Sequence, residues 1–160
     1  MNIRKIKTHE TDFLADMLYE AIFIPEGQDA LPKDIIRDNS LSKYIDNWGK
    51  DQLDIAYVAE IDNQLVGAIW GRLFREENQG FGFIDDNTPE LSMAVKPDYR
   101  NKGVGTNMIK VIASEYKRIG VKYLSLSVDK ANDASRLYQR LRCEITNETE
   151  TSLTMRKALK

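Results

Sequence analysis

The feature that most constrains this chain is a predicted strand, turn and helix between residues 90 and 119. Alternation divides the strand at 90–95 into two faces: Leu91, Met93 and Val95 on one, and Glu90, Ser92 and Ala94 on the other. Pro97 ends the strand because it cannot donate to a ladder. A helix is expected from about 103 to 119, with Gly120 as its stop. With a further strand at 123–128, the unit is a βαβ crossover, which predicts two parallel strands.

The remaining segments predict a mixed sheet with helices. A short strand at 2–7 precedes a helix that ends before Pro25, and a second helix is expected from Pro32 to about Gly49. The segments 54–60 and 64–74 flank an Asp-Asn turn signal and read as a hairpin, and 75–88 is a polar loop. A short helix at 133–140 and strands near 142–147 and 151–157 follow. We expect one domain over 1–160 of the α/β (α+β) class.

Composition excludes several classes of function. One histidine, His9, and one cysteine, Cys143, cannot form an ordinary zinc site or an internal disulfide, and they disfavour a Ser-His or Cys-His nucleophile. A formal net charge of −2 gives no general attraction to nucleic acid or anionic lipid. No apolar run approaches the roughly 20 residues that span a bilayer, and the first residues carry no apolar signal core. We therefore expect a cytoplasmic protein with no metal, no nucleic-acid partner and no membrane partner.

The turn after the strand at 90–95 has the parts of an anion cradle. Gly103 and Gly105 allow a close backbone approach, a helix N-terminus presents free N–H groups, and Arg100 and Lys102 add positive charge. The dinucleotide-binding fingerprint G-x-G-x-x-G is not present, because Met108 stands where its third glycine would be. A Walker loop is absent as well. The alternative is a tight turn that uses glycine for geometry alone.

Two motifs resemble those of the GCN5-related N-acetyltransferase (GNAT) family, over about residues 53–141. The first is R-x-x-G-x-G, present as Arg100-Asn101-Lys102-Gly103-Val104-Gly105. The second is the segment from Asn132 to Tyr138, after which this chain has Arg142-Cys143 where the family usually has Gly-Phe. The resemblance implies a mixed, mostly antiparallel sheet of six to seven strands with about four helices and a central parallel pair splayed for acyl-CoA. Without the family, Asn132 is a helix cap and Tyr138 a core aromatic.

The resemblance also implies acetyl-CoA as co-substrate and a set of residues that bind it. They lie on the strand end, the turn and the second motif: Met93, Ala94, Val95, Arg100, Asn101, Lys102, Gly103, Val104, Gly105, Thr106, Asn132 and Tyr138. The implied reaction moves an acetyl group to a primary amine by direct attack, without a covalent enzyme intermediate. A coenzyme A-binding module without turnover, or a plain interaction domain, is the alternative.

A primary amine is almost wholly protonated at neutral pH, so the reaction benefits from a base. Glu90 is the candidate, with Asp85 or Asp86 in the adjacent loop as alternatives, and Tyr138 is the candidate acid for the leaving thiolate. The acceptor, a small-molecule or peptide amine, should be bordered by residues 22–49 and 72–88. Acids and aromatic walls there are Glu26, Asp29, Asp34, Glu76, Glu77, Asp85, Asp86, Trp48, Phe81 and Phe83. A homodimer is a further partner arrangement that we expect for this chain.

Overall fold

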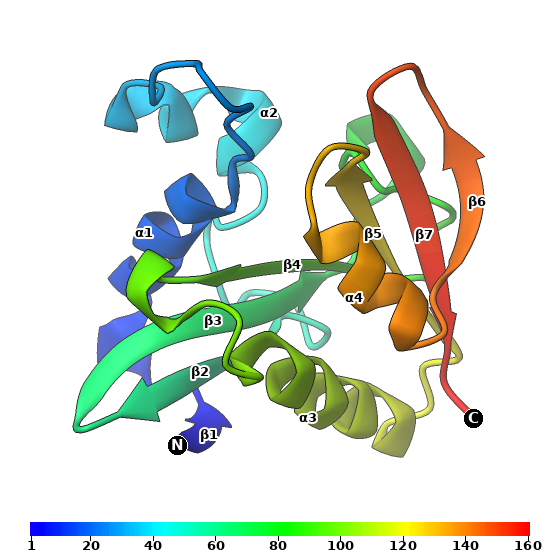
Figure 1. Ribbon diagram of the computed structural model, residues 1–160. Helices are drawn as coiled ribbons and strands as arrows, with labels where there is room; N and C mark the ends of the chain where they lie inside the picture. Colours follow the sequence, from blue (N-terminus) through cyan, green and yellow to red (C-terminus); the bar gives the residue numbers. More distant parts are fainter.

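Seven strands form one mixed sheet in the order β1-β2-β3-β4-β5-β7-β6, in a computed structural model that describes residues 1–160 (Figure 1). The strands are β1 (Asn2–Lys5), β2 (Ile55–Ile61), β3 (Gln64–Arg72), β4 (Glu90–Val95), β5 (Tyr123–Asp129), β6 (Glu144–Glu148) and β7 (Ser152–Ala158). Neighbouring strands are antiparallel except β4 and β5, which are parallel. The predicted crossover and the mostly antiparallel sheet are confirmed.

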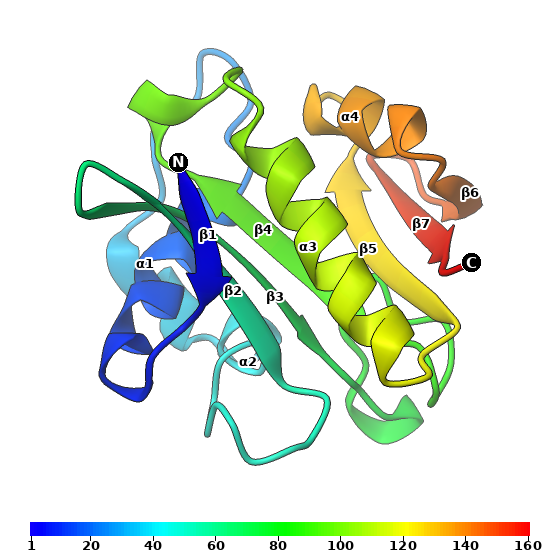
Figure 2. The same cartoon turned by 90° about the horizontal axis from the view of Figure 1, so that it is seen from below.

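Four α-helices cover the two faces of the sheet. They are α1 (Asp12–Ala21), α2 (Asn39–Ser42), α3 (Val104–Arg118) and α4 (Ala134–Arg140). Figure 2 shows α3 in front of the sheet, with α1 and α2 behind it. None of the helices is long and apolar enough to cross a membrane.

The alternation predicted for β4 divides the core in two. Leu91 belongs to the cluster on the α3 side, which contains Met108, Ile112 and Tyr116. Ala94 belongs to the cluster on the other face, which contains the buried residues of α1 and Trp70. The two faces of β4 therefore meet different layers, and Glu90 belongs to the face that meets α1 and α2.

The structure corrects two expectations about helices. The helix predicted from Pro32 to Gly49 is wrong, because a 3₁₀ turn at Lys33–Arg37 is separated from the one-turn α2 by Asp38 in an extended conformation. The Asp38 carboxylate accepts the Ser40 N–H at 3.0 Å and so begins a new helix instead of continuing the old one. The helix expected to reach residue 119 ends at Arg118, and Ile119, which follows its last turn, is 41% exposed.

The parallel pair β4–β5 is bridged at a single position. Glu90 is paired with Ser125, and the Ser125 N–H donates to the Pro89 carbonyl at 2.9 Å. Beyond that point the two strands turn away from each other (Figure 1). The backbone edge of β4 that faces β5 is therefore without a strand partner over most of its length, and the expected splayed central pair is confirmed.

Candidate active site

The turn between β4 and α3 presents a run of free backbone donors. The N–H groups of residues 101–106 donate no hydrogen bond within the chain, and the first bond that closes α3 is Asn107 N–H to the Gly103 carbonyl at 3.1 Å. Gly103 has φ 84° and Asn101 has φ 61°, so both lie in the left-handed region. Six N–H groups at a helix N-terminus form a site that favours negative charge.

Gly105 brings three elements together at this turn. A Cβ atom there would lie 3.1 Å from Met93 Cε of β4 and 3.4 Å from Leu137 Cδ2 of α4. Glycine at this position therefore lets the start of α3 lie directly on β4 and α4. The structure thus brings together the turn, the end of β4 and α4, which are elements that carry predicted binding residues.

The two cationic side chains of the turn have different roles. The Arg100 Nε donates to the Val95 carbonyl at 2.8 Å, and its guanidinium also pairs with Glu20 of α1 at 3.4 Å. Arg100 therefore ties the turn to the end of β4 and to α1. Lys102 Nζ lies 5.7 Å from the centre of the Tyr99 ring and makes no ion pair, so its charge is available at the turn.

The second predicted motif begins just before α4. Asn132 Oδ1 accepts the Ala134 N–H at 2.9 Å, which forms an Asx turn that leads into α4, whose N-cap residue is Asp133. Tyr138 packs, half-buried, against the core on the α3 side. Burial, and next the neighbouring Cys143 thiol, raise the pKa of the Tyr138 hydroxyl, so the hydroxyl keeps its proton at neutral pH.

Glu90 is on the opposite face and is almost sealed, with 4% of its surface exposed. Its Oε2 accepts a hydrogen bond from the Tyr44 hydroxyl at 2.5 Å, whereas Oε1 has no hydrogen-bond partner. Burial raises the pKa of Glu90 to about 7, and the Tyr44 hydrogen bond opposes that rise. A carboxyl that titrates near neutral pH can exchange a proton under ordinary conditions.

The alternative bases in the loop are engaged elsewhere. Asp85 Oδ1 accepts the Asn87 N–H at 2.8 Å and the Thr88 hydroxyl at 2.9 Å, and Asp86 accepts the Glu76 N–H at 3.1 Å. These carboxylates fix the loop that precedes β4. Of the three candidates, Glu90 alone is buried.

Sequence reasoning missed the buried ion pair that anchors the segment after α2. Arg72 Nε and Nη2 bond to the two carboxylate oxygens of Asp54 at 3.0 and 2.9 Å, and Arg72 Nη1 bonds to the carbonyls of Lys43 and Asp46 at 2.8 and 2.7 Å. Trp48, expected as a wall of the acceptor site, instead stacks on Arg72 at 5.0 Å. The available signal in the sequence was an arginine at the end of an apolar strand, and the structure places it opposite Glu90 in the β3–β4 register.

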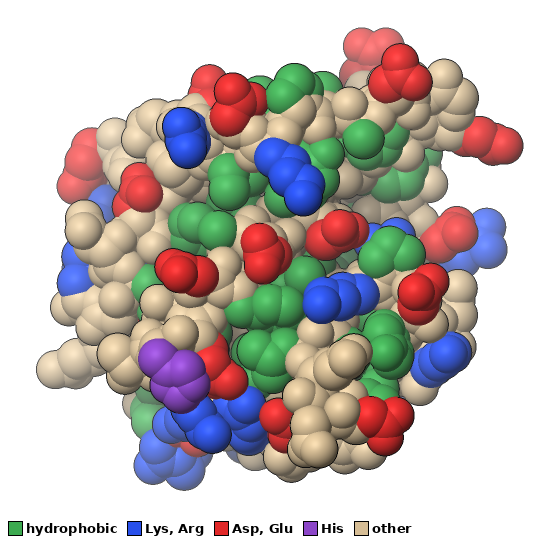
Figure 3. Space-filling view, turned by 90° about the vertical axis from the view of Figure 1, so that its left-hand side faces the viewer, with side chains coloured by type: hydrophobic (Ala, Val, Ile, Leu, Met, Phe, Trp, Pro, Cys, Tyr) green, Lys and Arg blue, Asp and Glu red, His purple; other side chains and the backbone are tan.

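A cleft of about 540 Å³ lies where β4 ends, between α1 and the 3₁₀ turn at Lys33–Arg37. Its charged lining residues are Asp16, Glu20, Lys33, Lys96 and Asp98. Figure 3 shows a face of the molecule on which acidic and basic side chains are interspersed, with apolar side chains between them. At roughly 3.3 Å per residue, the cleft at Lys96 is about 20 Å along the chain from Glu90.

The sequence model of the acetyltransferase (GNAT) family matches residues 17–142, which is most of the chain. The chain belongs to this family. An uncharacterized N-acetyltransferase from Methanocaldococcus jannaschii is 37% identical over 87 residues, which are 53% of this chain and 49% of that protein. The chain thus spans about half the length of this curated relative.

Solved structures share the GNAT fold over nearly the whole chain. The ribosomal-protein-alanine N-acetyltransferase of Brucella melitensis has a TM-score of 0.69 at 19% identity, with 99% of this chain and 100% of that one covered. A Salmonella typhimurium protein, described as an acetyltransferase and solved with acetyl-CoA, has 0.70 at 19%, covering 100% and 94%. The PaiA N-acetyltransferase of Thermoplasma acidophilum, solved with coenzyme A, has 0.70 at 17%, covering 98% of each chain.

Proposed function

We propose that this GNAT chain is an N-acetyltransferase that moves the acetyl group of acetyl-CoA directly to a primary amine. The observation that carries the proposal is the run of six free N–H groups at residues 101–106, beyond the end of β4 that is not paired with β5. A helix N-terminus with unpaired donors binds phosphate groups without further residues. The unpaired edge of β4 beside it suits an extended ligand that carries amide groups.

The residues present fit coenzyme A. The N–H groups of 101–106 and the Lys102 side chain would hold the pyrophosphate. The backbone of residues 93–95 on the open edge of β4 would hold the pantetheine arm, and Asn132 and Tyr138 would border it from the side of α4. Acetyl-CoA supplies a thioester carbonyl that an amine can attack.

Two side chains would transfer protons, and they lie on opposite faces of the sheet. Glu90 would take a proton from the attacking amine, because its pKa of about 7 leaves it partly ionised at neutral pH. Tyr138 would return a proton to the departing sulfur, because burial raises its pKa and keeps it protonated. Glu90 belongs to the α1 and α2 side of the sheet and Tyr138 to the α3 side. No side chain needs to form a covalent bond to the acetyl group.

The acceptor should approach from the side of α1 and α2, since that is the layer into which Glu90 faces. A peptide N-terminus and a small-molecule amine both present the required nucleophile. The likeness to ribosomal-protein-alanine N-acetyltransferases makes a peptide amine one arm of the test.

The proposal is tested first by binding and then by turnover. Coenzyme A at 100 times its Kd should stabilise the folded chain by about 2.7 kcal/mol, which a thermal melt detects. Thiol release from acetyl-CoA should then appear with at least one member of a panel of polyamines, aminoglycosides, amino acids and peptide N-termini. Binding without turnover would favour the non-catalytic module, for which the sealed position of Glu90 is an argument. An absence of stabilisation would contradict both.

Tyr138→Phe is expected to slow thiol release by about tenfold, while coenzyme A affinity stays nearly unchanged. The effect should be moderate because a thiolate with an ordinary pKa of about 8.5 leaves without much assistance. The phenylalanine keeps the packing of α4 on the core. Steady-state rates across pH values measure the loss, and a rate equal to the parent's at every pH would remove Tyr138 from the mechanism.

A further inference from the structure

The Tyr44 hydroxyl joins the candidate base to the loop that covers it. It donates to Glu90 Oε2 at 2.5 Å and accepts the Phe81 backbone N–H at 2.7 Å. Burial first, and then the Glu90 charge, raise the pKa of Tyr44, so the hydroxyl remains a donor at neutral pH. One side chain, 46 positions from Glu90 along the sequence, thus contacts both groups.

The position of Tyr44 is fixed independently of Glu90. Its carbonyl accepts the Trp70 Nε1–H of β3 at 3.2 Å, and the carbonyls of the flanking Lys43 and Asp46 are held by Arg72. Its ring meets the Phe74 ring edge to face, with centroids 5.0 Å apart. Contacts other than the one with Glu90 therefore fix Tyr44, so its hydroxyl can hold the Glu90 carboxyl in place.

The segment 79–83 lies over Glu90 and is also bound by Tyr44. A Cβ atom on Gly80 would lie 2.3 Å from Glu90 Oε1 and 2.7 Å from the Tyr44 hydroxyl oxygen. Lys43 Nζ donates to the Gln79 carbonyl at 2.7 Å, and the Phe81 ring stacks on Tyr44 at 6.2 Å. Phe81 itself is 62% exposed, so its ring faces outward while its backbone is fixed.

We propose that Tyr44 is the positioning residue of Glu90. It holds Oε2, leaves Oε1 without a hydrogen bond, and fixes the segment 79–83 over the carboxyl. The inference rests on the proposed role of Glu90 as the base of the acetyl transfer.

The charged surroundings of Glu90 are simple enough for a titration to be interpreted. Lys43, beside Tyr44, lowers the pKa of Glu90 through its charge. Arg72, opposite on β3, is engaged with Asp54 and two carbonyls. Ser125, opposite on β5, brings a buried hydroxyl without charge, and the segment 79–83 brings no titratable side chain. Tyr44 is the residue whose hydroxyl bonds to the carboxyl, and the Gly82 backbone, on the segment 79–83, also lowers the pKa of Glu90.

The test compares Tyr44→Phe with Tyr116→Phe in the full chain. Tyr116 is also buried and donates to the Leu53 carbonyl at 2.7 Å, on the other layer, so its variant loses a comparable hydroxyl away from Glu90. The Glu90 carboxyl is followed by carbon-13 NMR, with its signal assigned by its absence from Glu90→Gln. Amide hydrogen exchange at Phe81 and thermal melts are measured on the same samples.

Tyr44→Phe should raise the Glu90 titration midpoint by about one to two pH units, because a hydrogen bond to the charged form is lost. Turnover at pH 7 should fall by about 5- to 50-fold and recover at higher pH, and Phe81 amide exchange should accelerate. Tyr116→Phe should change the melt and none of these three. An unchanged titration and Phe81 exchange in Tyr44→Phe would overturn the inference even if the variant melts earlier.

The measurements distinguish a failure of this inference from a failure of the proposed function. If Glu90→Gln keeps the parent turnover, the base assignment fails, while the titration and exchange still report whether Tyr44 positions the carboxyl. If Glu90→Gln loses turnover and Tyr44→Phe leaves the titration and the pH profile unchanged, the base stands and the positioning role is wrong.

Discussion

Glu90→Gln is expected to lower acetyl-CoA turnover by about 10²- to 10⁴-fold, the usual range for loss of a positioned base. Glutamine keeps the size of the side chain and can still accept the Tyr44 hydrogen bond, but it cannot take a proton from an amine. Coenzyme A affinity should stay nearly unchanged, because the free N–H groups of 101–106 lie beyond the opposite end of β4. Thiol release and a coenzyme A binding isotherm measure the two quantities.

The same substitution should change how stability depends on pH. The pKa of Glu90 is about 7 in the folded chain against an ordinary 4.5, so the folded state binds its proton more tightly than the unfolded state. The contribution of Glu90 to stability is then greatest below about pH 4.5 and falls as pH rises toward 7. Urea unfolding at a series of pH values should show this decline in the parent and a weaker one in Glu90→Gln. Identical curves would mean that Glu90 is not the perturbed group.

Asp54→Ala is expected to destabilise the fold by about 3–5 kcal/mol, because it leaves a buried guanidinium charge without its partner. The side chains of Asp54 and Arg72 are 0% and 8% exposed, so water cannot replace the lost contacts. Asp54 also accepts the Gly49 N–H at 3.1 Å, which is lost with the carboxylate. The free energy of unfolding, from urea titration monitored by circular dichroism, measures the effect.

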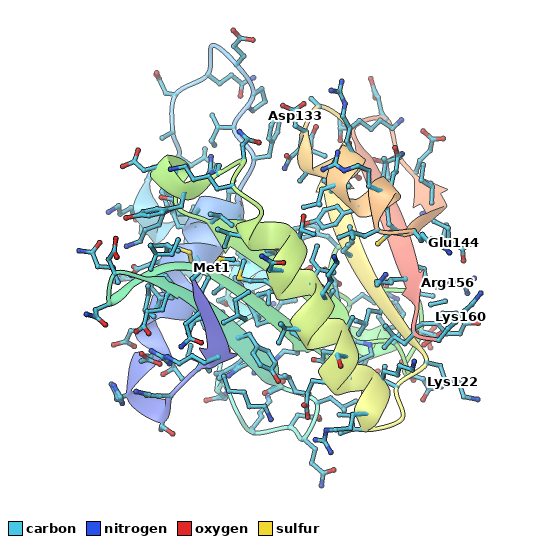
Figure 4. The ribbon with its side chains drawn as sticks, turned by 60° about the horizontal axis from the view of Figure 1, so that its bottom comes forward. Met1, Lys122, Asp133, Glu144, Arg156 and Lys160 are labelled. Carbon is cyan, nitrogen blue, oxygen red and sulfur yellow. The ribbon has the colours of Figure 1, made fainter.

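An ion pair at the sheet edge provides the matched control. Glu144 of β6 and Arg156 of β7 lie side by side at the surface (Figure 4), with side chains 59% and 35% exposed. Glu144→Ala should hardly move the melting temperature, because solvent screens an exposed pair. Equal melting temperatures for Asp54→Ala and Glu144→Ala would show that the buried pair does not anchor the segment after α2.

The parts of the fold that the sequence predicted are those encoded by neighbouring residues. The period-two pattern at 90–95 assigned Leu91 and Ala94 to opposite layers, and both assignments are confirmed. Gly120, with φ 92°, ends α3 as expected. The strand boundaries at 90–95 and 151–157 lie within a residue of those observed, because each is marked by polar or turn residues nearby.

The contacts that surround Glu90 could not be predicted, because they join residues that are far apart in the chain. Tyr44 falls within the helix expected from Pro32 to about Gly49. Its contact with Glu90 depends on how Arg72 and Trp70 bind the backbone carbonyls of the segment after α2. Those bonds join β3 to the segment after α2, so they depend on contacts between parts of the chain that are far apart in sequence. Hydrophobic periodicity carries no signal for a buried ion pair or for a hydroxyl shared between a loop and a carboxylate.

Because β4 and β5 are paired at one position alone, the sheet consists of two parts, here called leaves, and the boundary between β4 and β5 is the seam between them. One leaf holds β1 to β4 and the other holds β5, β7 and β6, so breathing motions should open along the seam before either leaf loses its own ladders. Exchange of amide hydrogens should accordingly be faster on the β4-facing edge of β5 than inside β2 or β3. A molecule bound along the seam would stiffen both leaves at once, and its effect would reach strands that it never touches.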